Sequence, residues 1–261
     1  MPEREPSFEQ EEKEIDPEFI GKVENAKLQI PDKVNLLLVK AGVKPATEIT
    51  FNVGSDGEII SLTTKELEDI ESLIGQSGLP YEIMRTIISP EKPELIEALV
   101  SGSADTLEKI KVAFEAMPSM QEVERGEYSH ERRMSNYKDL GTAFGYPPTA
   151  VEAFTGQGAK ERLDDKNLRQ EVRESDAFIF SRFALSKDNW QEELKQGEVW
   201  ADCIRSLSPK LYQEMREHVE AALENKAEIF QEIEEMPSEI LEKGRELIKP
   251  LGEKIKKLKE E

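Results

Sequence analysis

The chain has 261 residues but only one cysteine, two histidines and 7% aromatic residues. A single thiol, Cys203, excludes an internal disulfide and a cysteine-based zinc site, and it is typical of a reducing compartment. The longest purely aliphatic run covers residues 36–39, far short of the roughly 20 residues that a membrane helix needs. The first residues are acidic, whereas a signal peptide is basic and then apolar. These absences predict a cytoplasmic protein without a membrane span.

Basic residues are also in the minority. Lys and Arg number 35 against 55 Asp and Glu, which gives a formal net charge of -20. Nucleic-acid affinity depends largely on basic side chains that displace counterions from phosphates. A local basic patch is compatible with this composition, but a surface this negative disfavours general nucleic-acid binding.

Charge and hydrophobic patterning divide the chain into four predicted parts. Residues 1–19 hold eight acidic and two basic side chains and few large apolar ones, so we expect a disordered acidic arm. Residues 20–125 mix short alternating runs with helical periodicity, which predicts a small α/β domain. Residues 126–225 are almost wholly helical in pattern, and residues 226–261 form an amphipathic C-terminal helical extension.

The first half contains the signals for a small sheet. Apolar residues alternate on both sides of the Gly-Ser-Asp-Gly turn at 54–57, which predicts a hairpin over residues 49–62. Thr63 and Glu66 have the spacing of a capping box that opens a helix. A further strand is expected over 81–87, followed by helices through Leu95–Val100 and Leu107–Met117. The predicted sheet has helices on one face.

The second half predicts helices joined by tight breaks. A helix is expected over 129–144, a short one follows the Gly145–Pro148 break, and Phe178, Phe180 and Phe183 suggest an extended segment. Ser208 and Pro209 have the cap-plus-proline pattern that opens another helix. The predicted fold class is therefore α+β and predominantly helical, with a small sheet and hairpin in the N-terminal part.

Candidate chemistry gathers on the helix over 129–144. His130 and Tyr137 share one helical face, where they could form a proton-transfer pair or part of an ordinary buried stripe, and packing is the favoured interpretation. Glu127 and His130 match the Glu-x-x-His spacing of di-metal bundles. The only other histidine, His218, has Met215 three residues before it, so the second pair is missing. No metal or cofactor is therefore predicted.

The least generic stretch is the Gly145-Tyr146-Pro147 corner with its flanks, residues 140–154. This stretch resembles a group of uncharacterised archaeal and bacterial proteins with a Gly-Tyr-Pro helix junction. The resemblance covers about 15 residues and implies no known activity. In that group a pair of cysteines commonly follows the junction, whereas Thr149 and Ala150 stand here. Any thiol or metal role of the family is therefore not expected to carry over.

Two functional hypotheses remain. The first is a non-catalytic interaction or regulatory protein that contacts another protein, or itself, through the C-terminal helix. The second is a small-molecule-binding protein or metal-independent enzyme with its site between the α/β and helical parts, near the Gly145-Tyr146-Pro147 corner. Its candidate ligand-binding residues are His130, Tyr137, Tyr146 and Arg182, the last as a partner for an anionic ligand.

Overall fold

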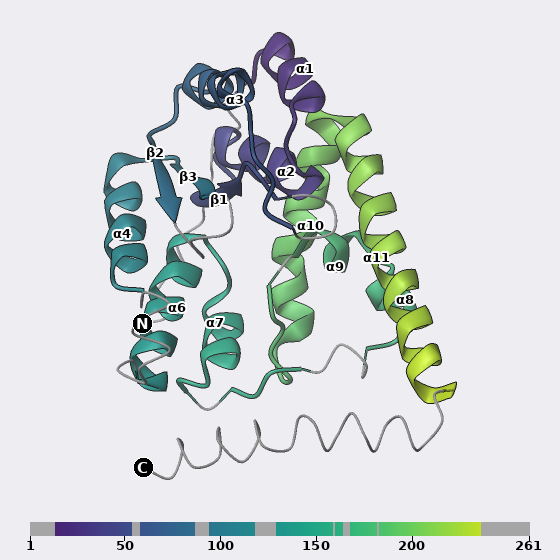
Figure 1. Cartoon of the computed structure of the whole chain (residues 1–261). Coiled ribbons are helices and arrows are strands. Elements are labelled where there is room, and N and C mark those ends of the chain that lie inside the picture. The colour runs from purple at the N-terminus through teal and green to yellow at the C-terminus, as the bar shows by residue number, and fades with distance from the viewer. Residues whose placement is uncertain are drawn as a thin grey trace, which may run out of the picture. The chain divides into compact units, whose positions relative to one another are not determined.

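The computed structural model confirms the predicted fold class: the protein is α+β and mainly helical, with a small antiparallel sheet in its N-terminal part (Figure 1). The structure describes residues 14–53, 58–86, 94–117, 129–158, 160–163, 168–181 and 183–235, except for the side chains of residues 224–235. The helices are α1 (Pro17–Asn25), α2 (Ile30–Lys40), α3 (Thr64–Gln76), α4 (Ala104–Glu115), α6 (His130–Ala143), α7 (Pro148–Thr155), α8 (Gln170–Arg173), α9 (Asp176–Ser181), α10 (Trp190–Leu207) and α11 (Pro209–Glu235). The strands are β1 (Ala46–Thr50), β2 (Tyr81–Thr86) and β3 (Leu95–Ser101).

The sheet has the order β1-β3-β2, and both pairs of neighbours are antiparallel. One face of the sheet meets α4 and α6 in a core that includes Ala46, Leu99, Ile110 and Leu140. Ala98 and Val100 point to the opposite face of β3 and are also fully buried, and α2 contacts both β1 and β3. Helices therefore cover both faces of the sheet, and the expectation of helices on one face is wrong.

The largest error in the predicted elements concerns strand β3. A helix was expected at Leu95–Val100, but the segment Leu95–Ser101 is a strand. From residue 96 to residue 101 every side chain is buried. A short apolar run of this length suits a strand buried on both faces as well as a turn of buried helix, and periodicity does not separate the two. The run becomes a strand because β1 and β2 pair with it on both sides.

The predicted hairpin over 49–62 is present only as an isolated bridge. Val53 pairs with Ile59 in antiparallel fashion, and the amide of Ile60 donates to the carbonyl of Asn52 at 2.8 Å. The turn at 54–57 lies outside the described residues. Strand β1 pairs with β3 instead of continuing into this bridge.

Local capping signals predicted their elements better than strand signals did. Thr63 opens α3 with the predicted capping box, in which Glu66 returns a side-chain bond to the amide of Thr63 at 2.9 Å. Ser208 accepts a hydrogen bond from the amide of Leu211 at 3.1 Å at the start of α11. These short-range patterns need only a few neighbouring residues, so tertiary packing does not override them.

Two other segments differ from their predicted structure. Helix α1 begins inside the predicted acidic arm at Pro17, because Ile15 and Phe19 supply apolar surface that becomes buried; residues 1–13 lie outside the described residues. The segment of Phe178 and Phe180, expected to be extended, belongs to helix α9, which packs closely along α10.

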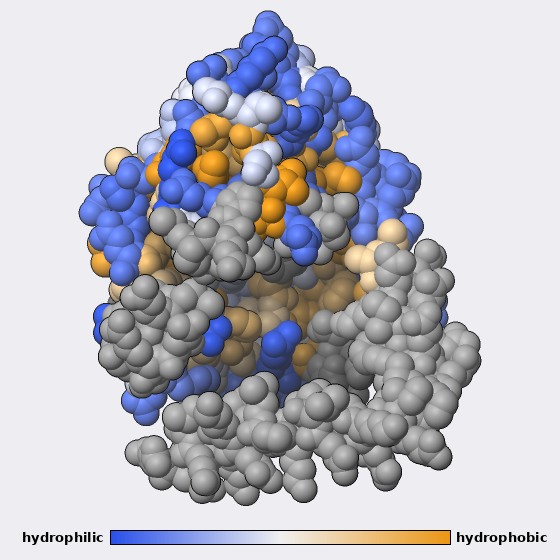
Figure 2. All heavy atoms as spheres, in the orientation of Figure 1, coloured by the Kyte–Doolittle hydropathy of each residue, from blue (hydrophilic) through white to orange (hydrophobic). Residues whose placement is uncertain are grey.

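The chain divides into two compact units, Met1–Glu217 and His218–Glu261. Elements on both sides of the predicted boundary at residue 125 pack together within the first unit, as α6 does on α4 and α10 on α2. Figure 2 shows that hydrophobic side chains reach the surface of one face beneath the polar surface of α1 and α3. Among the helices that the structure describes, none has an apolar stretch long enough to span a membrane.

Candidate functional site

The Gly145-Tyr146-Pro147 corner forms as its sequence predicts. Gly145 has a positive φ of 76°, and Pro148 stands at the start of α7. A side chain at Gly145 would also place its Cβ 2.5 Å from Cδ of Pro45. Glycine is therefore required here both by backbone conformation and by close approach.

Tyr146 leaves the corner and enters an aromatic cluster around Lys44. Its ring centroid lies 5.4 Å from that of Phe183 and 6.4 Å from that of Trp200. The Lys44 ammonium lies 5.6 Å from the centroid of the Tyr146 ring and 5.1 Å from that of Trp200, and it donates to Oδ1 of Asn35 at 2.7 Å. Lys44 is only 2% exposed, so these ring faces and the amide replace its water shell.

Tyr137 lies in a different environment. Its ring meets Phe154 of α7 edge to face at 5.7 Å, and its hydroxyl accepts from Arg133 at 3.2 Å. His130 is exposed at the first position of α6, and Arg182 lies outside the described residues. The structure thus gives Tyr137 and Tyr146 separate sets of neighbours, and the predicted ligand-binding set stays a prediction as a group.

A buried carboxylate near the corner was missed by sequence reasoning. Glu193 of α10 is 2% exposed and accepts hydrogen bonds from the hydroxyl of Thr149 at 2.5 Å and from the amide and hydroxyl of Ser186 at 2.7 and 2.5 Å. These bonds tie the first turn of α7 and the segment before α10 to α10 itself. Three donors satisfy its hydrogen-bonding capacity, so Glu193 acts as a structural anchor.

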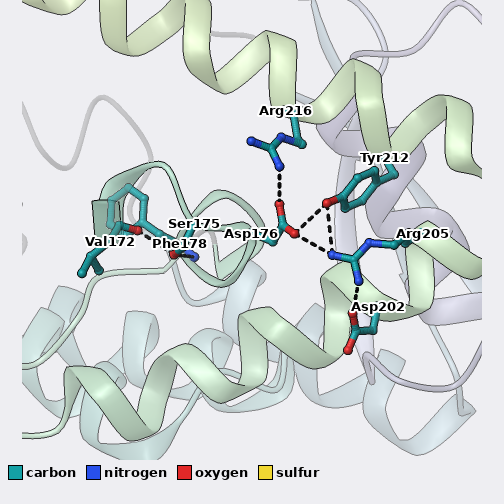
Figure 3. Close-up of polar contacts among 8 residues, drawn as sticks. All are labelled: Val172, Ser175, Asp176, Phe178, Asp202, Arg205, Tyr212 and Arg216. Atoms are coloured by element: carbon teal, nitrogen blue, oxygen red, sulfur yellow. Dashed lines mark hydrogen bonds and ion pairs between the residues drawn. The ribbon is translucent and has the colours of Figure 1, made fainter. Parts of the chain in front are cut away.

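Asp176 is the centre of a second polar network (Figure 3). Its carboxylate accepts from the hydroxyl of Tyr212 at 2.6 Å, from Arg205 at 2.5 Å and from Arg216 at 3.0 Å. Arg205 also pairs with Asp202. Since the two aspartates balance the two arginines, the network joins α9, α10 and the start of α11 without a net charge.

Glu48 and Glu97 form an unusual pair on the sheet. Their side chains are hydrogen-bonded to each other, although the residues belong to neighbouring strands β1 and β3. Burial, the bond to Glu97 and the charge of nearby Asp32 raise the pKa of Glu48 to about 9. The pair therefore holds a proton at neutral pH. The one sequence signal for this pair was Glu97 itself, a charged residue inside the apolar run of β3.

Cys203 lines a cleft between segments of the predicted α/β and helical parts. The cleft has a volume of about 560 Å³ and lies among α1, α10 and the segment after α2. Glu14 and Glu24 lie on its wall beside Cys203, and Ile15 and Leu207 supply apolar surface. Glu24 accepts from the hydroxyl of Ser208 at 2.6 Å. The lining includes no histidine to serve as a base for the thiol.

Within the part of the chain that the structure describes, no group of three or more histidine, cysteine, aspartate and glutamate side chains is arranged to hold a metal ion. No family model, curated protein or solved structure matches the chain. The resemblance at the Gly-Tyr-Pro corner therefore stays a prediction.

Proposed function

We propose that this protein is a non-catalytic interaction protein of the cytoplasm, which acts by binding another protein or a second copy of itself. The proposal is supported by the structural role of three buried or partly buried charged side chains. Lys44 is enclosed by aromatic rings, Glu193 holds two segments against α10, and Asp176 joins three helices. Each group has partners that stabilise the fold, so none is poised to transfer a proton to a substrate.

The observation that carries the proposal is that Glu193 and Asp176 are each hydrogen-bonded to groups from neighbouring segments and so hold the fold together. Cys203 lies in a cleft whose lining has no histidine, and His130 is exposed at the start of α6. Nucleophilic catalysis requires a nucleophile and a base within hydrogen-bonding distance of each other. His130, a candidate base in the sequence, lies outside the lining of the cleft that holds Cys203.

The C-terminal segment supplies the test. By sequence, Ile248, Leu251, Ile255 and Leu258 follow the three- and four-residue spacing of a self-association seam. Deletion of residues 238–261 is expected to change the oligomeric state measured by light scattering, or the partners recovered in a defined pull-down. The circular dichroism spectrum of the remaining chain should keep its helical signal.

A matched pair of variants separates apolar association from charge. I248S/L251S/I255S/L258S should reproduce the deletion, whereas K254Q/K256Q/K257Q/K259Q should retain the mass of the wild type. Unchanged mass and unchanged partners after deletion would rule out the C-terminal segment as the interaction surface.

The cleft at Cys203 supports one alternative, a small-molecule-binding protein. Its volume lies within the range of about 300–1,000 Å³ that is usual for ligand pockets. A metabolite that binds there should raise the melting temperature and slow alkylation of Cys203. The variant L207W, which fills the cleft, should abolish both effects. A metabolite that stabilises the protein without protecting the thiol would place its site elsewhere.

A further inference from the structure

Two exposed arginines and two aromatic rings form a continuous row over α6, α7 and the segment at residues 160–163. The guanidinium of Arg133 lies 5.4 Å from the centroid of the Tyr137 ring, which packs edge to face on Phe154. The guanidinium of Arg162 lies 6.0 Å from the centroid of Phe154. Phe154 is 46% exposed, although most phenylalanine side chains are buried in folded proteins. We call Arg133, Tyr137, Phe154 and Arg162 the Arg–aromatic ladder.

The charges of the ladder are not neutralised within the described structure. Neither Arg133 nor Arg162 has a carboxylate within ion-pair distance among the described residues, in a chain with 55 acidic side chains. Glu161, the residue before Arg162, is paired with another basic side chain, whereas Asp164 and Asp165 lie outside the described residues. Glu161 pairs with Lys187 at 2.9 Å, and the carboxylate of Glu152 lies against Gly158.

The ladder is also held in place by the fold. Tyr137 packs against the core shared by the sheet, α4 and α6. The backbone around Arg162 is tied to the segment before α10, because the amide of Leu163 donates to the carbonyl of Leu185 and that of Lys187 to Glu161, both at 2.8 Å. A backbone held in this way loses little conformational freedom when a partner binds.

We propose that the Arg–aromatic ladder binds an acidic segment of a protein partner, in which an apolar side chain stands next to carboxylates. Guanidinium groups bind carboxylates through paired hydrogen bonds, and the exposed ring of Phe154 offers apolar contact between them. This inference rests on the proposed interaction function and names its partner chemistry.

Net charge favours a short acidic segment over a nucleic acid. Interactions between exposed charges are screened beyond about 8 Å at physiological ionic strength, so a short segment is attracted mainly by the two guanidiniums. A nucleic acid extends over many phosphates and would meet the surface of a chain whose net charge is -20.

The test uses the full-length protein and three fluorescein-labelled probes: a peptide in which glutamates flank phenylalanines, the same peptide with glutamine for glutamate, and single-stranded oligodeoxythymidine. R133Q/R162Q is expected to weaken binding of the acidic peptide about tenfold, which corresponds to about 1.4 kcal/mol. F154A should also weaken it severalfold, and R133K/R162K should restore part of the affinity. The control R85Q/R169Q makes the same charge change at exposed sites outside the ladder and should alter affinity less than about twofold.

Several results would overturn the proposal. These are an acidic peptide that does not bind the wild-type protein, equal binding of the glutamine peptide, or an equal loss in R85Q/R169Q. Tighter binding of the oligonucleotide with the same dependence on Arg133 and Arg162 would assign the ladder to nucleic acid. A thermal melt of each variant separates lost binding from lost folding. The mass change on deletion of residues 238–261 does not involve the ladder, so its outcome judges the proposed function separately.

Discussion

At the residue scale, two glutamates show how neighbouring groups decide the role of a carboxyl side chain. Glu193 accepts three hydrogen bonds from hydroxyl and amide donors of two other segments. Glu48 faces another carboxylate, Glu97, and is influenced by the charge of Asp32. The first glutamate therefore anchors two chain segments through its hydrogen bonds, whereas the second favours a form in which the pair keeps a proton.

The Glu48–Glu97 pair gives the protein a predicted pH dependence. The folded-state pKa of Glu48 is raised from 4.5 to about 9, so the folded protein keeps a proton that the unfolded chain has lost. The stabilising contribution of this proton is complete below about pH 4.5 and is lost progressively as pH rises to about 9. In E48Q the side-chain amide can still donate a hydrogen bond to Glu97, but it does not ionise in this pH range. Its free energy of unfolding should exceed that of wild type by on the order of 1–3 kcal/mol near pH 8.

Chemical denaturation across this pH range checks the prediction. The difference between E48Q and wild type should grow from acid to alkaline pH. The control E68Q, on the exposed side of α3, should show no such growth. A difference that is constant with pH would mean that Glu48 and Glu97 do not share a proton.

Asp176 provides a second residue-scale prediction. D176N removes the charge that two arginines share, and hydrogen bonds to charged groups contribute about 1.5–3 kcal/mol each. Since all these side chains are partly exposed, we expect a smaller total loss of about 1–3 kcal/mol in the free energy of unfolding. D202N, whose partner pair lies on the surface of one helix, should cost less than about 1 kcal/mol. Equal losses in the two variants would contradict a central role for Asp176.

At the element scale, Gly197 sets how closely α9 and α10 approach. A Cβ on residue 197 would overlap the carbonyl oxygen of Ala177, which belongs to the backbone of α9. The contact between these helices therefore depends on the absence of a side chain at one position. The pattern of Phe178 and Phe180 does not reveal this, because the glycine that admits the helix lies some twenty residues later in the sequence.

G197A tests this close approach, and G21A is its matched control. Gly21 also lies in a helix, but a Cβ there has nothing within 4 Å. G197A should lower the free energy of unfolding by about 2–4 kcal/mol, because the backbone of α9 must shift. G21A should be neutral or raise it by up to about 1 kcal/mol through helix propensity. Thermal unfolding of both variants measures the difference, and a G197A protein as stable as G21A would refute the packing argument.

The difference between local and long-range determinants explains which elements the sequence could predict. The capping box at Thr63 and the Gly145 corner depend on a few adjacent residues, and both are confirmed. Strand β3 and helix α9 depend on partners far away in the chain, and both were predicted wrongly. Propensity decides the first kind of element, whereas tertiary packing decides the second.

The candidate sites follow the same rule. Tyr146 was singled out because its corner is unusual, but its neighbours Lys44 and Trp200 come from distant segments that no local pattern joins to it. Arg162 carries no motif at all. Its place beside Phe154 is set by the pairing of its backbone with the segment at Ser186.

At the scale of the whole molecule, the first unit contains the hydrophobic core of the described chain. The buried residues extend from Ile15 to Met215, and the unit ends at Glu217. Since burial of apolar surface is the main source of stability, this unit should fold without the residues that follow it. Its surface charge is spread over many acidic side chains, so a cationic surface such as the Arg–aromatic ladder is a local exception within it.

Truncation after Glu217 tests this autonomy. The shortened chain should unfold cooperatively, with a melting temperature within about 2 °C of the full chain, because a change of 1 kcal/mol shifts the midpoint by roughly 2–4 °C at this size. Truncation after Ser208 is the matched control. It removes Leu211 and Met215, which are at most 1% exposed, together with Arg216, a partner of Asp176. Loss of two buried side chains costs several kcal/mol, so this chain should melt at least 10 °C lower, by roughly the same scaling. If the chain that ends at Glu217 also failed to unfold cooperatively in circular dichroism, the stability of the first unit would depend on residues beyond Glu217.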